Sequence, residues 1–207
     1  MMDCPVYNVI EYLPADFLSK TVNEPFIQML MSRVFPDTRW VPGNPDKFEP
    51  DYFCNGTPFE FTLASDCNRK NNFIQKIRQK TYSTSDADAD VISFIRQRIS
   101  DKASKKYKVP NVHLCVLCLL DMTGWVLDKY GSVTQPISDW SRQEFFDEIR
   151  ATYIASGIFS NVFILFPDMF ARWWIWDLRT DKRTSIQLED SDLKSGSYPY
   201  CLCKDRN

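Results

Sequence analysis

One short pair of residues, Asn55-Gly56, constrains the fold of this chain more than any other feature. It separates two largely apolar segments, 51–54 and 57–63, and Asn-Gly in such a place is the strongest short-range indication of a tight β-hairpin. A two-residue turn also fixes how the two strands pair, which sets Asp51 opposite Glu60. The sequence therefore predicts a hairpin that brings two carboxylates face to face.

Asp51 and Glu60 would then carry like charges at close range. As a non-hydrogen-bonded pair, their Cα atoms would lie about 4.5 Å apart with both side chains on one face. Alternation along the second strand places Thr62 on that face too. A hard divalent cation, or protonation of one acid, would relieve the repulsion. The alternative is structural: Asp51 only begins a strand, and Glu60 pairs with a nearby lysine or arginine.

The rest of the chain shows helical and extended patterns in turn. Asn23 is the expected N-cap of the first helix, and the residues from Thr180 onward receive no assignment. Segment 112–120 is almost entirely apolar, as is typical of a central strand covered on both faces. Helices are predicted over 24–35, 73–78, 90–108 and 141–156, and further strands over 39–41, 112–120, 162–166 and 172–178.

Length and composition restrict the class of protein. A chain of 207 residues with 44% apolar content is expected to form a single domain. Its longest apolar run is too short to span a bilayer, so we expect no membrane association. The seven cysteines lie mostly in apolar segments and not at the spacings of a disulfide scaffold, which predicts reduced thiols and a cytoplasmic protein.

The net charge of −2 hides an uneven distribution along the chain. Residues 1–60 hold nine acidic and four basic side chains, whereas residues 69–108 hold eleven basic and four acidic ones. Such a basic stripe can follow a phosphate backbone, although a solvated lysine-rich helix face explains it equally well. The candidate nucleic-acid-binding residues are Arg69, Lys70, Lys76, Arg78, Lys80, Lys102, Lys105 and Lys106.

Pro50-Asp51, the turn, and then Glu60-Phe61-Thr62, within this order of helices and strands, resemble the PD-(D/E)XK nuclease superfamily. The resemblance covers about 23–120 and leaves 121–207 as a C-terminal extension. It implies a restriction-endonuclease-like α/β fold: a central mixed β-sheet flanked by helices, in the order α-β-β-β-α-β and then α-β-β. It also implies that Asp51, Glu60 and the Phe61 carbonyl hold Mg²⁺ or Mn²⁺, with Glu24 on the first helix as a further ligand.

The sequence departs from this superfamily at the catalytic lysine. Position 62 is Thr, and a hydroxyl group can orient a water molecule but cannot supply positive charge to a phosphate. Members of the superfamily sometimes take the lysine from a neighbouring element, and Lys70 or Lys76 is the expected substitute.

The predicted function is therefore that of a metal-dependent endonuclease that hydrolyses DNA. DNA is the expected partner, and a homodimer is left open. The main alternative is a catalytically inactive module that keeps the fold and binds nucleic acid or a protein, and Thr62 is the feature that favours it. Two observations separate these hypotheses: whether the carboxylates of Asp51 and Glu60 converge on one point, and whether an ammonium group lies near it.

Overall fold

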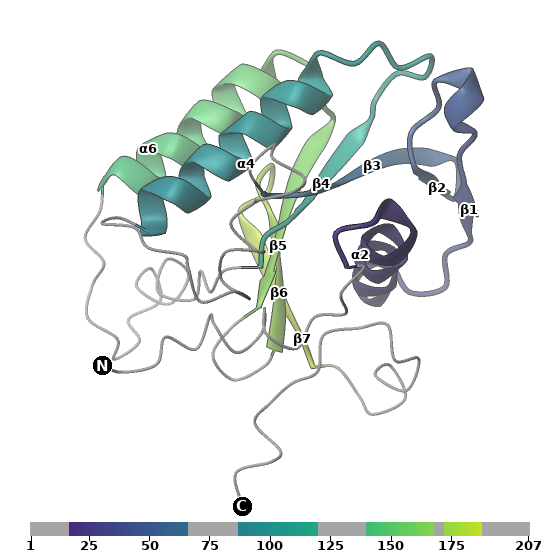
Figure 1. Cartoon of the computed structure of the whole chain (residues 1–207), viewed down its shortest axis with the longest axis horizontal. Coiled ribbons are helices and arrows are strands. Elements are labelled where there is room, and N and C mark those ends of the chain that lie inside the picture. The colour runs from purple at the N-terminus through teal and green to yellow at the C-terminus, as the bar shows by residue number, and fades with distance from the viewer. Residues whose placement is uncertain (1–16, 66–86, 120–139, 168–171, 188–207) are drawn as a thin grey trace, which may run out of the picture.

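A computed structural model of the chain describes residues 17–65, 87–119, 140–167 and 172–187. Within these residues, one seven-stranded sheet has its strands in chain order, from β1 to β7 (Figure 1). The strands are β1 (Trp40–Pro42), β2 (Tyr52–Cys54), β3 (Thr57–Leu63), β4 (His113–Leu117), β5 (Asn161–Pro167), β6 (Arg172–Asp177) and β7 (Lys182–Gln187). The sheet is mixed, because β4 runs parallel to both of its neighbours while the other pairs are antiparallel.

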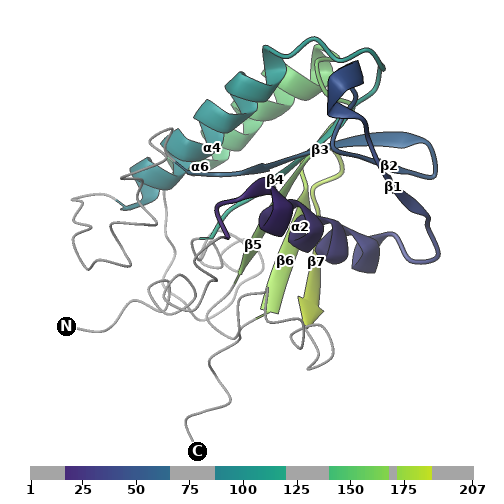
Figure 2. The same ribbon diagram turned by 45° about the vertical axis from the view of Figure 1, so that its right-hand side comes forward.

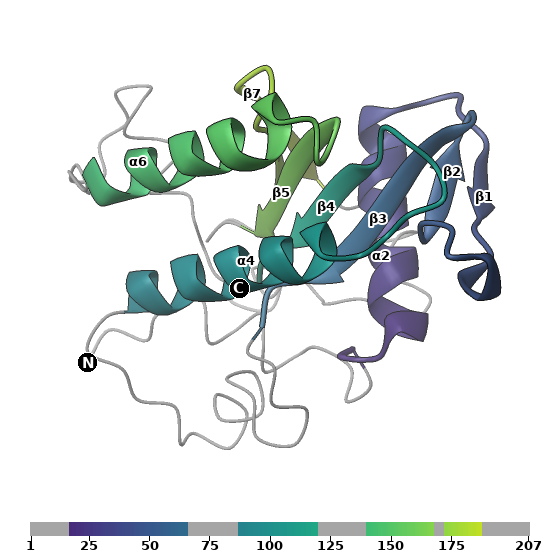
Figure 3. The same ribbon diagram turned by 90° about the horizontal axis from the view of Figure 1, so that it is seen from above.

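Helices cover both faces of this sheet. They are α2 (Lys20–Val34), α4 (Ala87–Ala103) and α6 (Trp140–Ile149), with a short 3-10 helix, η1 (Pro45–Lys47), and a π-helical stretch, η3 (Arg150–Ala155), directly after α6. In Figure 2, α4 and α6 lie above the sheet and α2 lies below it, and Figure 3 shows α4 and α6 side by side. Two successive crossovers that move the same way across a sheet place their helices on one face, as α4 and α6 do here.

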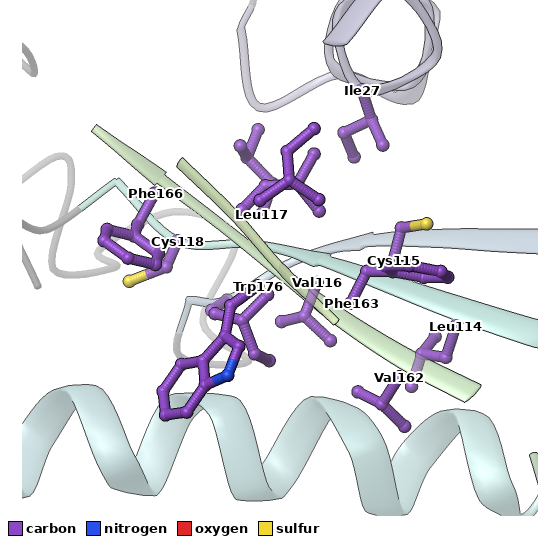
Figure 4. Packing of buried hydrophobic residues seen from close by; sticks show 14 of the residues in the cluster. Ile27, Leu114, Cys115, Val116, Leu117, Cys118, Val162, Phe163, Phe166 and Trp176 are labelled. Atoms are coloured by element: carbon purple, nitrogen blue, oxygen red, sulfur yellow. The ribbon is translucent and has the colours of Figure 1, made fainter. Parts of the chain in front are cut away.

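The core lies on both sides of β4, as expected for a strand whose residues after His113 are all apolar. Cys115 and Leu117 point towards Ile27 of α2, whereas Leu114 and Val116 point to the opposite side (Figure 4). All five of these side chains are fully buried. The central strand predicted over 112–120 is thus confirmed, in a shorter form.

The predicted hairpin is confirmed, and its register is confirmed for three residue pairs; Asp51 precedes β2, so the predicted Asp51–Glu60 pair is not part of the ladder. Tyr52 pairs with Phe59, Phe53 with Pro58 and Cys54 with Thr57. The turn residues Asn55 and Gly56 have φ angles of 48° and 85°, the left-handed conformation that a two-residue hairpin turn requires. Asn55 also contacts the residue before β1, because its Oδ1 accepts a hydrogen bond from the backbone N–H of Arg39 at 3.0 Å.

Two helices differ most from their predicted bounds, and one strand was not predicted. The first helix begins at Lys20 and not at Glu24, because Ser19 and not Asn23 caps it; the Ser19 hydroxyl accepts from Thr21 N at 3.4 Å. The helix predicted to reach Lys108 ends at Ala103.

The third difference is a missed strand. The segment after Thr180, which received no assignment, forms β7 and pairs with β6 along its whole length. The short helix predicted over 73–78 lies outside the described residues. None of the described helices is long and apolar enough to cross a membrane.

Candidate active site

The site lies beside the first residue of β2, at the point where β3 extends beyond its pairing with β2. β2 contributes three residues to the sheet and β3 contributes seven, so the second half of β3 lacks a strand on this side. Asp51, directly before β2, partly replaces that strand: its Oδ2 accepts a hydrogen bond from the backbone N–H of Phe61 at 2.7 Å. The hairpin therefore delivers the Asp51 carboxylate to an open edge of the sheet, beside Glu60.

Lys102 of α4 connects the two acids. Its Nζ donates to Glu60 Oε1 in a short contact and lies 3.9 Å from Asp51 Oδ2. The Glu60 side chain is only 1% exposed and that of Lys102 is 9% exposed, so this ion pair is inside the protein. The two carboxylates thus lie on either side of one ammonium group, and Glu60 pairs with a lysine as the structural alternative expects.

Further lysines flank this centre. Lys105 Nζ donates to the same Glu60 oxygen at 2.7 Å. Lys20 Nζ, on α2, lies 2.7 Å from Glu24 Oε1 and 3.2 Å from Asp51 Oδ1. The site therefore contains three carboxylates and three ammonium groups, contributed by both helical layers and by the hairpin.

A cavity of about 810 Å³ opens beside these groups. Its walls come from the start of α2, the free half of β3 and the end of α4. The polar residues among its lining are Ser19, Lys20, Asn23, Glu24, Thr62, Ser65, Arg98, Asp101, Lys102 and Lys105. A ligand in this cavity would therefore meet Lys20, Glu24, Lys102 and Lys105, whereas Asp51 and Glu60 are not among the residues that line it.

The position of α4 explains why Lys102 points inward. Ile95 and Ile99 are fully buried, and Lys102 continues the same helical stripe three residues later. Arg98 ties the helix to the end of β3, because its Nε donates to the Ser65 carbonyl at 3.1 Å. A lysine at an apolar position of an amphipathic helix was a visible signal, but it was missed because the basic residues of this segment were all assigned to the solvent face.

Burial lowers the pKa of a lysine in this cluster and raises the pKa of an acid, and neighbouring charges add to or oppose each shift. Burial lowers the pKa of Lys102, and the neighbouring Lys105 adds to that effect against the attraction of Glu60 and Asp51. Burial raises the pKa of Glu24, and the negative charge of Asp51 raises it further, while Lys20 works against both. The Tyr107 hydroxyl also has a raised pKa, through burial and the nearby charge of Glu60, and stays protonated at neutral pH.

Glu24 is expected to cost the protein stability at neutral pH. The pKa of Glu24 is higher in the folded than in the unfolded protein, so the protonated side chain stabilises the fold. This stabilisation is complete at pH values below the pKa of the unfolded protein and is lost as the pH rises through the pKa of the folded protein. Glu24→Gln should therefore raise the Tm at pH 7 and have a smaller effect at pH 4. Thermal unfolding at both pH values measures this.

The matched control is Glu144→Gln, because Glu144 is an exposed acid outside the site. This substitution is expected to leave the Tm almost unchanged at both pH values. A Tm of Glu24→Gln below that of the wild type at pH 7 would contradict the prediction.

The structure brings several of the predicted site residues together. Asp51, Glu60 and Phe61 are in direct or shared contact, and Glu24 joins them through Lys20. Thr62 is buried and lines the cavity, but it carries no charge. The predicted substitute lysines, Lys70 and Lys76, lie outside the described residues, as do Arg69, Arg78 and Lys80.

Among the described residues, the lysines of the basic stripe have two different environments: some contact the acid centre and others are exposed. Lys102 and Lys105 contact Glu60, so these two residues belong to the acid centre as well as to the stripe. Lys106 is exposed. The alternative of a uniformly solvated lysine face is therefore wrong for Lys102.

The oxygen atoms at this centre suit a hard cation. No three His, Cys, Asp or Glu side chains in the described ranges are grouped closely enough to hold an ion on their own. Asp51 and Glu60 would thus need the Phe61 carbonyl and water as further ligands, and Mg²⁺ characteristically keeps several waters beside one or two carboxylates. In the structure these two carboxylates bind the ammonium groups of Lys20, Lys102 and Lys105, which a metal ion would have to displace.

Comparisons with known proteins add no relative. No protein-family model and no curated protein matches the sequence, and no solved structure matches the fold.

Proposed function

We propose that this chain is a metal-dependent nuclease that hydrolyses phosphodiester bonds of DNA on a restriction-endonuclease-like core. The convergence of Asp51 and Glu60 on the Lys102 ammonium group, at the open edge of a mixed sheet, carries the proposal. An acid pair on a hairpin with a lysine beside it is the chemical set that the PD-(D/E)XK resemblance implies. In this proposal α4 supplies the lysine that position 62 lacks.

Asp51, Glu60 and the Phe61 carbonyl would hold the metal ion, Mg²⁺ or Mn²⁺. When bound, such an ion lowers the pKa of a coordinated water and neutralises charge on the phosphate. The N–H of Phe61 orients Asp51 for this role, since it binds the Oδ2 atom and is part of the rigid sheet.

Lys102 is the proposed catalytic cation. An ammonium group beside the acid pair stabilises the negative charge that develops on the phosphate during hydrolysis. Burial lowers its pKa, so the Lys102 ammonium group would give a proton to the leaving oxygen more readily than an exposed lysine would. Lys20 and Lys105, which also line the cavity, would attract the phosphates on either side.

A cleavage assay tests this proposal. Supercoiled, linear and branched DNA are incubated with the wild type and with Glu60→Gln, in Mg²⁺, in Mn²⁺ and in EDTA. The wild type should cleave at least one of these substrates only with metal, and Glu60→Gln should lose that activity. Equal cleavage by both proteins, or cleavage in EDTA, would contradict the mechanism.

The second candidate is the non-catalytic module, and the ion pairs of the site favour it. Each of the three acids already has a lysine partner, so the cluster is electrically balanced without a metal ion. In that case the wild type would bind DNA without cleaving it under any of the conditions above. Under either hypothesis we propose that the protein is cytoplasmic, which the buried free thiols of Cys54 and Cys115 support.

A further inference from the structure

An exposed aromatic side chain lies on the loop that precedes Asp51. Phe48 follows η1 and is 66% exposed, which makes it the most exposed large hydrophobic residue in the described part of the chain. Its φ angle is 56°, a left-handed conformation that is unusual for a bulky side chain. Neither burial nor backbone preference explains a phenylalanine here.

Phe48 is anchored to the segment that follows α4. The N–H of Lys108 donates to the Phe48 carbonyl at 3.4 Å, and the Lys108 ammonium group lies 5.5 Å from the centre of the Phe48 ring. In Figures 1 and 2 the short dark-blue turn that precedes Phe48 lies beside the teal loop after α4. The ring is therefore held in place and is not a freely moving surface group.

Exposed lysines lie next to Phe48 in the sequence and on the segment whose Lys108 contacts the ring. Lys47, Lys105, Lys106 and Lys108 are all exposed, and together with Phe48 they form what we call the Phe48 surface. Two acids lie on the same loop: Asp46, and Glu49, whose Oε2 atom accepts from Asn44 N at 2.8 Å. The lysines outnumber these acids by two to one, so the surface attracts a polyanion.

The Phe48 surface borders the acid centre on two sides. Lys105 belongs to it and also contacts Glu60. The same loop, through Pro45, Glu49 and Pro50, lines a second pocket of about 260 Å³ that it shares with Lys20, Glu24 and Asp51. The loop that carries Phe48 and the Lys105 side chain thus both border the acid centre.

We infer that the Phe48 surface binds single-stranded DNA, with the Phe48 ring stacked on an unpaired base and the lysines on the neighbouring phosphates. An aromatic ring can stack on a base only where that base is free of its duplex, whereas lysines hold the backbone of either form. The inference rests on the proposed nuclease function, because it names the form of DNA that this site would take.

Binding measurements in EDTA, where metal-dependent cleavage is blocked, test the inference. Fluorescence anisotropy is recorded with a labelled 15-nucleotide single strand and with a duplex of the same sequence. Phe48→Ala should weaken single-strand binding about tenfold, which corresponds to the stacking of one base, and should leave duplex binding nearly unchanged. Phe48→Trp should restore single-strand affinity, because tryptophan also stacks.

Two further variants separate stacking from other effects. Ile158→Ala removes another exposed apolar side chain, 46% exposed, and should bind like the wild type. Lys108→Ala should reduce the salt dependence of binding, by about 0.7 in the slope of log K against log salt for a phosphate contact on a single strand. Phe48→Gly should lose affinity as Phe48→Ala does while its Tm stays level or rises, since glycine adopts the positive φ freely.

The outcomes distinguish the inference from the proposed function. Single-strand binding that depends on Phe48, in a protein that cleaves nothing, would support the inference and reject the nuclease. Metal-dependent cleavage with unchanged single-strand affinity in Phe48→Ala would support the nuclease and overturn the inference. A wild type that binds duplex more tightly than single strand, or equal losses in Phe48→Ala and Ile158→Ala, would also overturn it.

Discussion

Lys102→Met is expected to lower the free energy of unfolding by about 3 kcal/mol, because it leaves the buried Glu60 carboxylate without its closest partner. Breaking a buried ion pair from one side typically costs 3–5 kcal/mol, and the estimate is at the low end because Lys105 still contacts Glu60. Urea denaturation at pH 7 measures the loss.

A double-mutant cycle separates the ion pair from simple packing. Glu60→Gln alone should also destabilise the protein, because Lys102 then keeps only Asp51, at 3.9 Å, as a partner. The double variant Glu60→Gln/Lys102→Met should be more stable than the sum of the two losses predicts, since neither buried charge remains. Additive losses would show that the pair contributes no coupling.

Lys106→Met provides the matched control for this cycle. Lys106 is exposed and lies only four residues from Lys102 in the sequence. Its replacement should change the free energy of unfolding by less than about 0.5 kcal/mol.

Mg²⁺ or Mn²⁺ is expected to stabilise the wild type but not Asp51→Asn. A ligand that binds only the folded protein adds about 2.7 kcal/mol at a concentration one hundred times its Kd. Asp51→Asn removes one of the two carboxylates that would hold the ion, while its amide oxygen can still accept from Phe61 N. Thermal unfolding across a metal titration measures the effect without any reference to cleavage.

Two variants sharpen the metal titration. Asp101→Asn removes an acid that lines the same cavity but contacts neither Asp51 nor Glu60, and it should keep most of the stabilisation. Lys102→Met should enlarge it, because the ammonium group that lies between the two carboxylates is then gone and only Lys20 and Lys105 still compete with the ion. Unchanged stabilisation in Asp51→Asn would place any metal elsewhere.

Lys102 has two proposed roles that these experiments keep apart. A purely structural lysine would give the coupling energy of the cycle, but cleavage would not depend on it beyond the loss of folded protein. A catalytic lysine would add a loss of cleavage in Lys102→Met that persists at temperatures where the variant is fully folded. The buried position of the group is consistent with both roles, since a lysine that contacts Glu60 also lines the cavity.

Local sequence patterns determined the hairpin and the central strand. Asn55-Gly56 adopts positive φ angles more readily than most residue pairs, so it dictated the turn and the register that follows from it. The continuous apolar run around Leu114 and Val116 is removed from water only when both faces of its strand are covered. These predictions rest on the chemistry of neighbouring residues, which is why they could be made from the sequence.

Other features needed contacts between distant segments. β7 consists largely of polar residues and exists because β6 offers it a pairing edge, which the local pattern does not show. The helix cap moved from Asn23 to Ser19 because Asn23 is buried and donates to the Phe17 carbonyl, a contact outside the helix.

The candidate site also combines a feature that follows from local sequence with one that depends on tertiary contacts. The sequence alone brought Asp51 close to Glu60, because the turn sets the register of the hairpin and Asp51 directly precedes its first strand. Only the tertiary structure decided which cation joins them: Lys102 is 42 residues beyond Glu60 and reaches it because α4 crosses over the sheet between β3 and β4. Periodicity shows which face of a helix is apolar, but packing decides what that face meets, so the charge that completes the site came from an element whose position no local pattern specifies.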